Sequence, residues 1–182
     1  LSLAKEAINF EQSILKEPVG IQDQIAASYG GFNITNISKN GSFKVKNLDI
    51  NEYKKTKFNN NLMLFFTGIS RFSGKYAAAQ IKNTNKNYNE LNKISEITKN
   101  AIQIFRSSDD FRSIGELMDE SWNLKKNLAK GISNQFIDNI YQESKSCGAI
   151  GGKLLGAGGG GFTLFYIEKK NQKKLKKRLS KL

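Results

Sequence analysis

Four consecutive glycines, Gly158 to Gly161, lie within the stretch GGKLLGAGGGGFTLFY, which runs from Gly151 to Tyr166. Glycine loses more backbone freedom on folding than any other residue, so a run of glycines constrains the fold around it. Apolar, strand-like residues flank the run, which predicts a strand, a glycine loop and a second strand. Two interpretations of the loop stay open: backbone N–H groups that converge on a phosphate, or a wide, flexible hairpin turn.

The glycine loop does not match the two commonest nucleotide-binding motifs. No Gly-Lys-Ser/Thr closes the run, so it is not the P-loop of the common NTPases. The residues that follow it, FTLFY, are strand-like, whereas a dinucleotide-binding GxGxxG opens a helix. The loop by itself therefore does not define the ligand.

Hydrophobic periodicity and turn residues predict the other elements. The predicted helices cover residues 1–16, a short segment within 20–31, 91–105, 114–128, 133–148 with Ser133 as N-cap and Gly148 as C-terminal stop, and the basic tail 169–182; the predicted strands cover 32–37, 42–50 and 62–66. Asn40–Gly41 predicts a hairpin turn between the first two strands. The segment LMLFF, Leu62 to Phe66, predicts a short buried strand. This mixture indicates α+β or α/β layers.

Composition excludes several classes of protein. The chain contains no histidine and a single cysteine, Cys147, which rules out a serine–histidine triad, an internal disulfide and a Cys/His zinc site within one chain. No apolar run approaches the roughly 20 residues that span a bilayer, and no signal peptide is evident. We therefore expect a cytoplasmic protein with no membrane partner.

The net charge of +13 raises the alternative of a basic nucleic-acid-binding module. Much of this charge lies in the tail KKNQKKLKKRLSKL. No zinc finger, helix-turn-helix or RNA-recognition motif accompanies the tail, and no aromatic residues interleave with its lysines. A solvated helix face therefore explains the tail better than a specific nucleic-acid site.

Three polar residues are candidates for chemistry, each with a plainer alternative. Asp23, in GIQDQ, could take the proton of a substrate hydroxyl or could cap a helix. Glu11 lies 12 residues earlier (23 − 11), on a helix face shared with apolar residues, where it could bind magnesium or simply reach water. Arg71, in TGISR at a strand end, could hold a phosphate with its planar guanidinium.

Four stretches together resemble the GHMP kinases, the family of galactokinase, homoserine kinase and mevalonate kinase. They are GIQDQIAASYGGFN, FFTGISR, SWNLKKNLAKGISNQFIDNIY and GAIGGKLLGAGGGGFTLFY. Within the family, the chain is similar to the bacterial kinases that phosphorylate D-glycero-D-manno-heptose 7-phosphate at the anomeric C1 hydroxyl. The resemblance implies an α+β fold of two lobes: the remnant of an S5-like N-terminal lobe in residues 1–57 and a ferredoxin-like C-terminal lobe in residues 58–182.

The resemblance also implies roles for particular residues. Asp23 matches the aspartate that acts as base or aligns the sugar hydroxyl, and Glu11 matches the glutamate that helps to hold Mg²⁺. The loop of Gly156, Ala157, Gly158, Gly159, Gly160 and Gly161 matches the family's third motif, on the ATP side of the site. Tyr29, Gly30, Gly31 and Arg71 fall where the family lines its sugar pocket.

The family's main ATP-binding segment, Pro-x-x-x-Gly-Leu-x-Ser-Ser-Ser, does not occur in these 182 residues. We therefore expect the chain by itself to be inactive. The resemblance implies ATP and a sugar phosphate as partners, no specific nucleic acid, and a surface-glycan precursor pathway through GDP-heptose; it allows a homodimer. A kinase for L-fucose or galactose is the alternative.

Overall fold

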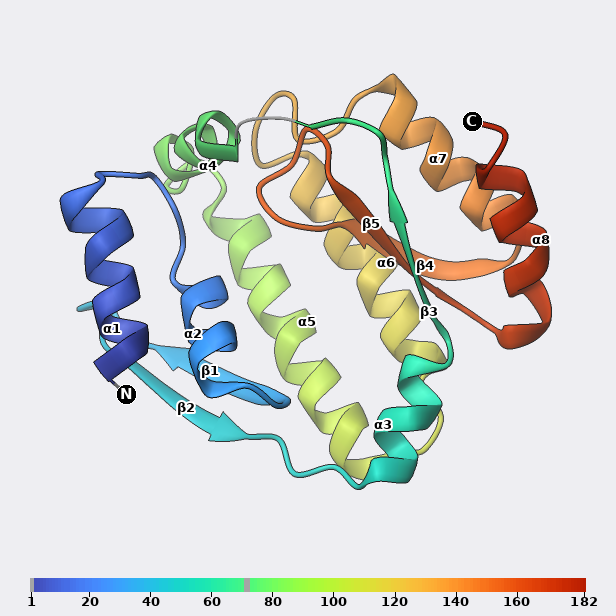
Figure 1. The fold of residues 1–182 in the computed structure, drawn as a ribbon, viewed down its shortest axis with the longest axis horizontal. Coiled ribbons are helices and arrows are strands. Elements are labelled where there is room, and N and C mark those ends of the chain that lie inside the picture. Colours follow the sequence, from blue (N-terminus) through green and yellow to red (C-terminus); the bar gives the residue numbers. More distant parts are fainter. Residues whose placement is uncertain (1, 71–72) are drawn as a thin grey trace. The chain divides into compact units, whose positions relative to one another are not determined.

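The protein was analysed as a computed structural model, which describes residues 2–70 and 73–182. The chain divides into two compact units, one up to Ile50 and one from Asn51 onward. Figure 1 shows the elements of each unit. The α+β class expected from the sequence is confirmed, because helices and antiparallel strands occur in both units.

The first unit contains helix α1 (Ser2–Asn9), a π-helix η1 (Phe10–Ile14), helix α2 (Gln22–Tyr29) and the strands β1 (Asn33–Ile37) and β2 (Phe43–Asn47). The strands form an antiparallel hairpin in which Thr35 lies opposite Val45. The place of the predicted hairpin is confirmed, but its loop is longer than the two residues that Asn40–Gly41 predicts, because β1 ends at Ile37 and β2 begins at Phe43. Gly41 has a φ of 80°, and Asn40 Oδ1 accepts a hydrogen bond from Ser42 N at 3.0 Å.

The helix predicted over residues 1–16 is confirmed from Ser2 to Ile14, but its second half is a π-helix. From Phe10 onward the backbone widens into the π-helix, in which Leu15 N donates to Phe10 O at 2.9 Å. Ile14 and Leu15 are then 62% and 51% exposed, so they do not share an inward face with Glu11. A π-helix shifts the following side chains around the axis, which a 3.6-residue periodicity cannot anticipate.

The second unit is built on a three-stranded antiparallel sheet of order β3-β5-β4, formed by β3 (Leu62–Phe66), β4 (Ala149–Leu154) and β5 (Phe162–Ile167). Its helices are α3 (Glu52–Asn59), α4 (Ser73–Lys82), α5 (Tyr88–Ser107), α6 (Arg112–Lys126), α7 (Gln135–Ser146) and α8 (Lys169–Leu179). One core joins these elements, and its fully buried side chains include Trp122, Ile132, Leu154, Phe165 and Leu175. Tyr141 packs on Phe165 with ring centroids 5.7 Å apart.

Close backbone contact holds α6 against β4. A Cβ atom on Gly151 would overlap the carbonyl oxygen of Gly115, so neither position tolerates a larger residue without movement. At the other end of α6, Lys125 Nζ donates to Gly156 O at 2.5 Å. Helix α6 therefore fixes both ends of the segment that leads into the glycine loop.

Several details of this unit differ from the sequence prediction. The strand β3 has the predicted bounds but is not buried, since Leu64 and Phe66 are 55% and 57% exposed. Asn134, and not Ser133, caps α7 by accepting from Ile137 N at 3.0 Å, and Phe136 is exposed. Gly148 ends that helix as expected, with a φ of 99°. Helices α3 and α4 were not predicted.

Candidate functional site

The glycine loop is pinned to the second unit and is not a flexible turn. Leu155 N donates to Phe162 O at 2.8 Å, which closes the hairpin at the ends of β4 and β5. Within the loop, Gly159 N donates to Ile132 O at 2.9 Å and Gly161 N donates to Ile69 O at 3.0 Å. These two N–H groups already have protein acceptors, so they are not available to a phosphate in this conformation.

Close packing explains why the loop consists of glycine. A Cβ on Gly158 would lie 2.9 Å from the Cα of Ile132, and one on Gly160 would lie 2.7 Å from Cγ2 of Ile69. At Gly158 the backbone also has a φ of 114°, a region that residues with a Cβ rarely adopt. The glycines therefore let the loop pack directly against the segments that contain Ile132 and Ile69, as a rigid structural support would require.

Two polar side chains that the sequence did not single out hold the loop's carbonyl groups. Gln80 Nε2, from α4, donates to Ala157 O at 2.8 Å, and Lys125 Nζ binds Gly156 O. The sequence carried no signal for Gln80, because it lies 77 residues from its partner in a helix without a clear apolar stripe. Lys125 likewise lies 31 residues from its partner.

Asp23 lies in the first turn of α2 and is exposed, so its carboxylate is accessible. Glu11 lies in the π-helix and is half-buried. Gln24 Nε2 donates to Glu11 Oε2 at 2.6 Å, which ties Glu11 to the residue directly after Asp23. The first unit thus brings the two predicted carboxylate positions into one neighbourhood of α2 and η1.

Gln24 is a further candidate that sequence reasoning missed. It is only 8% exposed, and its Oε1 has no hydrogen-bond partner among the described residues. The hydroxyl of Tyr29, one of the predicted sugar-pocket residues, is also buried without a described partner. Buried polar atoms nearly always have a hydrogen-bond partner. These two atoms have none among the described residues, so a ligand that binds beside α2 could supply the missing hydrogen bonds.

Glu11 fits magnesium as one ligand of an incomplete set. Its second carboxylate oxygen, Oε1, accepts no hydrogen bond from the residues that the structure describes. No cluster of three or more acidic, cysteine or histidine side chains occurs in residues 2–70 and 73–182. One carboxylate suffices for a magnesium ion that is otherwise bound by waters and by the phosphates of a nucleotide.

The remaining predicted residues form no further site. Gly30 and Gly31 follow α2 with φ values of 60° and 71°, as a sharp change of direction requires. Arg71 lies outside the described residues.

A cavity of about 820 Å³ opens between α1, η1 and the hairpin turn, and it includes Gln22. None of its described lining residues is acidic.

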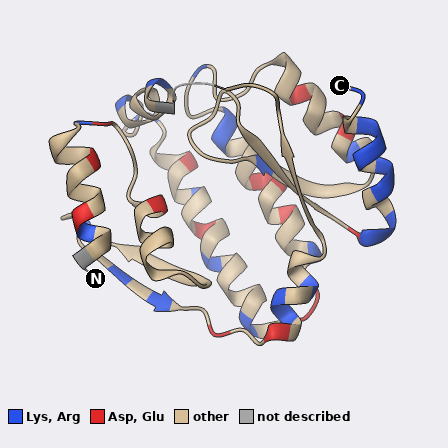
Figure 2. Cartoon of the chain, in the orientation of Figure 1, with Lys and Arg blue, Asp and Glu red and all other residues tan. Residues whose placement is uncertain are grey.

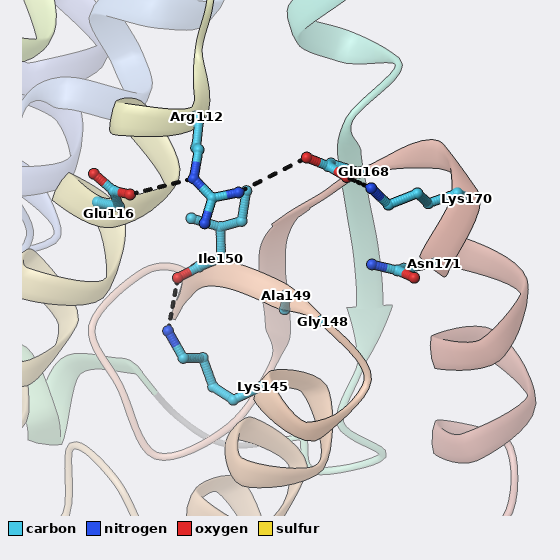
Figure 3. Close-up of a pocket in the computed structure, with 9 residues that line it drawn as sticks. All are labelled: Arg112, Glu116, Lys145, Gly148, Ala149, Ile150, Glu168, Lys170 and Asn171. Carbon is cyan, nitrogen blue, oxygen red and sulfur yellow. Dashed lines mark hydrogen bonds and ion pairs between the residues drawn. The ribbon is translucent and has the colours of Figure 1, made fainter.

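A second cavity, of about 510 Å³, lies between α6, α7, β4 and α8 (Figure 3). Its charged groups pair with one another: Arg112 lies between Glu116 at 3.5 Å and Glu168 at 3.8 Å, and Lys170 binds Glu168 at 2.6 Å. Lys145 Nζ donates to Ile150 O at 2.7 Å. The cavity contains none of the sequence-predicted catalytic, metal-binding or substrate residues that the structure describes, and its ion pairs account for its charge.

Fold and sequence together place the second unit in a known family. Residues 99–182 match the family described as GHMP kinases C terminal, and they belong to it. The fold of the chain is a GHMP kinase fold, as shown by a superposition with a TM-score of 0.69 on the crystal structure of a putative sugar kinase from Campylobacter jejuni. The two sequences are 30% identical, and the match covers 98% of this chain and 50% of the other.

Two curated proteins are similar to the chain. It is 31% identical over 183 residues to the D-glycero-alpha-D-manno-heptose 7-phosphate kinase of Campylobacter jejuni, covering 98% of this chain and 53% of that protein. It is 26% identical over 167 residues to the bifunctional fucokinase/GDP-fucose pyrophosphorylase of Arabidopsis thaliana, covering 88% of this chain and 16% of that protein. The chain thus spans about half the length of the heptose kinase that it matches.

No helix among the described residues is long and apolar enough to cross a membrane.

Proposed function

We propose that the protein is an ATP- and Mg²⁺-dependent sugar kinase that phosphorylates D-glycero-D-manno-heptose 7-phosphate at the C1 hydroxyl. The observation that carries the proposal is the Glu11–Gln24 hydrogen bond beside Asp23, together with the 31% identity to the heptose 7-phosphate kinase. The proposed domain division is residues 1–57 and 58–182. The proposed location is the cytoplasm, where ATP and sugar phosphates occur.

In this proposal Asp23 accepts the proton of the C1 hydroxyl. The hydroxyl oxygen forms a bond to the γ-phosphorus of ATP as the bond from that phosphorus to the β,γ-bridging oxygen breaks. Magnesium supplies charge neutralisation on the phosphates when it is bound, and Glu11 is its proposed protein ligand, oriented by Gln24. Tyr29, Gly30, Gly31 and Arg71 are the proposed sugar-pocket residues.

In this proposal the loop from Gly156 to Gly161 forms one side of the site, beside the ATP phosphates. Two of its N–H groups already bind Ile132 and Ile69, so its proposed contribution is shape. The sequence contains no Gly-Leu-x-Ser-Ser-Ser segment to bind ATP, and we propose that these 182 residues do not transfer phosphate by themselves. The product would feed nucleotide-activated heptose, a precursor of surface glycans.

The test is the substitution Asp23→Asn in the full-length protein, assayed with ATP and heptose 7-phosphate. Loss of a general base typically lowers turnover by about 10²–10⁴-fold. The control is Asp49→Asn, which alters another exposed aspartate of the same unit and should leave turnover unchanged. Turnover near the wild-type value in a folded Asp23→Asn protein would remove the proposed role of Asp23.

A kinase for L-fucose or galactose is the second candidate, and the similarity to the Arabidopsis fucokinase favours it. A substrate panel separates the two candidates, because heptose 7-phosphate carries a phosphate at C7 that L-fucose and galactose lack. A kcat/KM for free L-fucose or galactose that exceeds the value for heptose 7-phosphate would select the second candidate.

A further inference from the structure

The outward side of α8 and of the residues after it is strongly basic. Between Lys169 and Leu182 the sequence has eight lysine or arginine residues and no acidic residue. All eight side chains are exposed: Lys169, Lys170, Lys173, Lys174, Lys176, Lys177, Arg178 and Lys181. In Figure 2 these residues appear as a blue band along α8.

Most of this charge is not neutralised within the protein. Arg178 forms a bidentate ion pair with Glu143, at 2.7 and 2.6 Å, and Lys170 binds Glu168 at 2.6 Å. Lys174 donates to the carbonyl of Ser146. The other five lysines have no ion pair with any residue in the described part of the chain.

The apolar and amide side chains of α8 are used for packing on the protein. Leu175 is fully buried in the core, and Gln172 Nε2 donates to Asn60 O at 2.7 Å. Within α8 the outward side has no apolar residue that could enter a bilayer, and the single exposed Leu182 after the helix forms no apolar face of the kind that membrane-binding helices insert. It also presents no amide side chain that could read a base edge.

We propose that α8 binds the phosphate backbone of duplex DNA without sequence preference, by lying in the major groove. At 3.6 residues per turn the lysines of α8 that have no ion pair span about 160° of the helix circumference over a length of about 12 Å. A flat anionic surface touches a narrower arc, whereas a groove about 12 Å wide has phosphates on both walls. The major groove of A-form RNA is too narrow to admit a helix.

The experiment measures binding of the 182-residue chain to a short fluorescent B-form DNA duplex by anisotropy, over a salt series. The expected affinity falls steeply between about 50 and 200 mM salt, with a log–log slope of about −0.9 for each phosphate neutralised. Two duplexes of unrelated sequence should bind alike. A large preference for one sequence, or tighter binding to an RNA duplex or to anionic phospholipid vesicles, would overturn the proposal.

Two variants that remove the same charge distinguish the contribution of α8 to DNA binding from that of the net charge of the protein. The triple variant Lys173→Gln, Lys176→Gln, Lys177→Gln keeps strong helix formers on α8, and its slope should be shallower by roughly 0.9 for each lysine that contacted a phosphate. The control triple variant Lys93→Gln, Lys99→Gln, Lys130→Gln removes the same charge from exposed positions elsewhere. Circular dichroism checks that both fold. Equal losses in the two variants would show that binding follows net charge alone and would refute a site on α8.

Discussion

Tyr141 of α7 donates a hydrogen bond of 2.5 Å to Asp119 Oδ1 of α6, and its hydroxyl also lies 3.3 Å from the carbonyl oxygen of Gly152 in β4. Burial raises the pKa of Tyr141, and the carboxylate of Asp119 raises it further. The hydroxyl therefore stays protonated at neutral pH and donates to Asp119. One side chain thus links two helices and a strand.

We expect Tyr141→Phe to lower the free energy of unfolding by about 1.5–3 kcal/mol, the range for a hydrogen bond to a charged group. Asp119 keeps Lys145 at 3.2 Å, so the lower end of the range is expected. Urea denaturation of the 182-residue chain measures the change. Tyr88→Phe, at a residue that is 66% exposed, is the control, and a loss as large there would refute the assignment.

The packing of the glycine loop predicts a large effect of one methyl group. Gly158→Ala should lower stability by strain at a φ of 114° and by contact of the new Cβ with the backbone of Ile132. Gly68→Ala is matched, because Gly68 has a φ of 74° but no atom within 4 Å of a new Cβ. Overpacking costs about 1–3 kcal/mol, so Gly158→Ala should exceed Gly68→Ala by about this amount in thermal or urea unfolding. Equal costs would mean that the loop is not packed as described.

Lys153 of β4 predicts a stability effect that depends on pH. Burial lowers the pKa of its ammonium group, and no ion pair with a described residue offsets this. Below the lowered pKa the ammonium is charged in both the folded and the unfolded chain, so the folded chain bears the cost of burial. Between the lowered pKa and about 10.4 the folded chain loses its proton first, and the cost falls.

Lys153→Met should therefore raise the free energy of unfolding at neutral pH, and the gain should shrink as the pH rises toward about 10.4. Unfolding curves across that range, compared with the wild type, isolate the contribution of this group. Lys130→Met, at an exposed lysine, should show no such trend. A variant that is less stable than the wild type at neutral pH would contradict the expected direction.

The Glu11–Gln24 pair predicts a separable effect on magnesium. Gln24→Met fills the same buried space but cannot donate to Glu11, so the carboxylate loses its orientation. If Glu11 holds Mg²⁺ in the proposed reaction, the apparent magnesium affinity should fall about 10–100-fold, as when other supporting hydrogen bonds to metal ligands are removed. Gln22→Met alters an exposed neighbour as the control. Unchanged magnesium dependence in a folded Gln24→Met protein would contradict the role of Glu11.

How much of this could be predicted from the sequence depends on how local the signal is. The strand β3, the hairpin at Asn40–Gly41 and the stop at Gly148 follow from patterns within a few residues, and all three are confirmed. The exposure of Leu64 and Phe66 could not be predicted, because an apolar run does not report whether another element covers it. Helix α3 lacks an apolar stripe, and the capping of its first turn by Asn51 is its main local signal.

The candidate site divides in the same way. Asp23 and the glycines became candidates because they lie in short contiguous stretches that carry the resemblance, and Glu11 because it lies 12 residues before Asp23; their roles stay predictions. The supports were missed because they reach over long separations: Gln24 binds a residue 13 positions away, and Gln80 binds one 77 positions away. A single sequence contains no measure of which distant side chains meet, so the partners that orient a site are the part that requires a structure.

The pinning of the glycine loop has a consequence for the order of folding. Its anchors belong to distant segments: Thr67 N donates to Gly161 O, Gln80 to Ala157 O, and Gly159 N to Ile132 O. Contacts between residues so far apart in the chain form only after a large loss of chain entropy, so we expect them to be absent from the folding transition state. Substitutions at the loop should then speed unfolding while leaving the folding rate almost unchanged, which makes this loop a determinant of how long the folded protein persists.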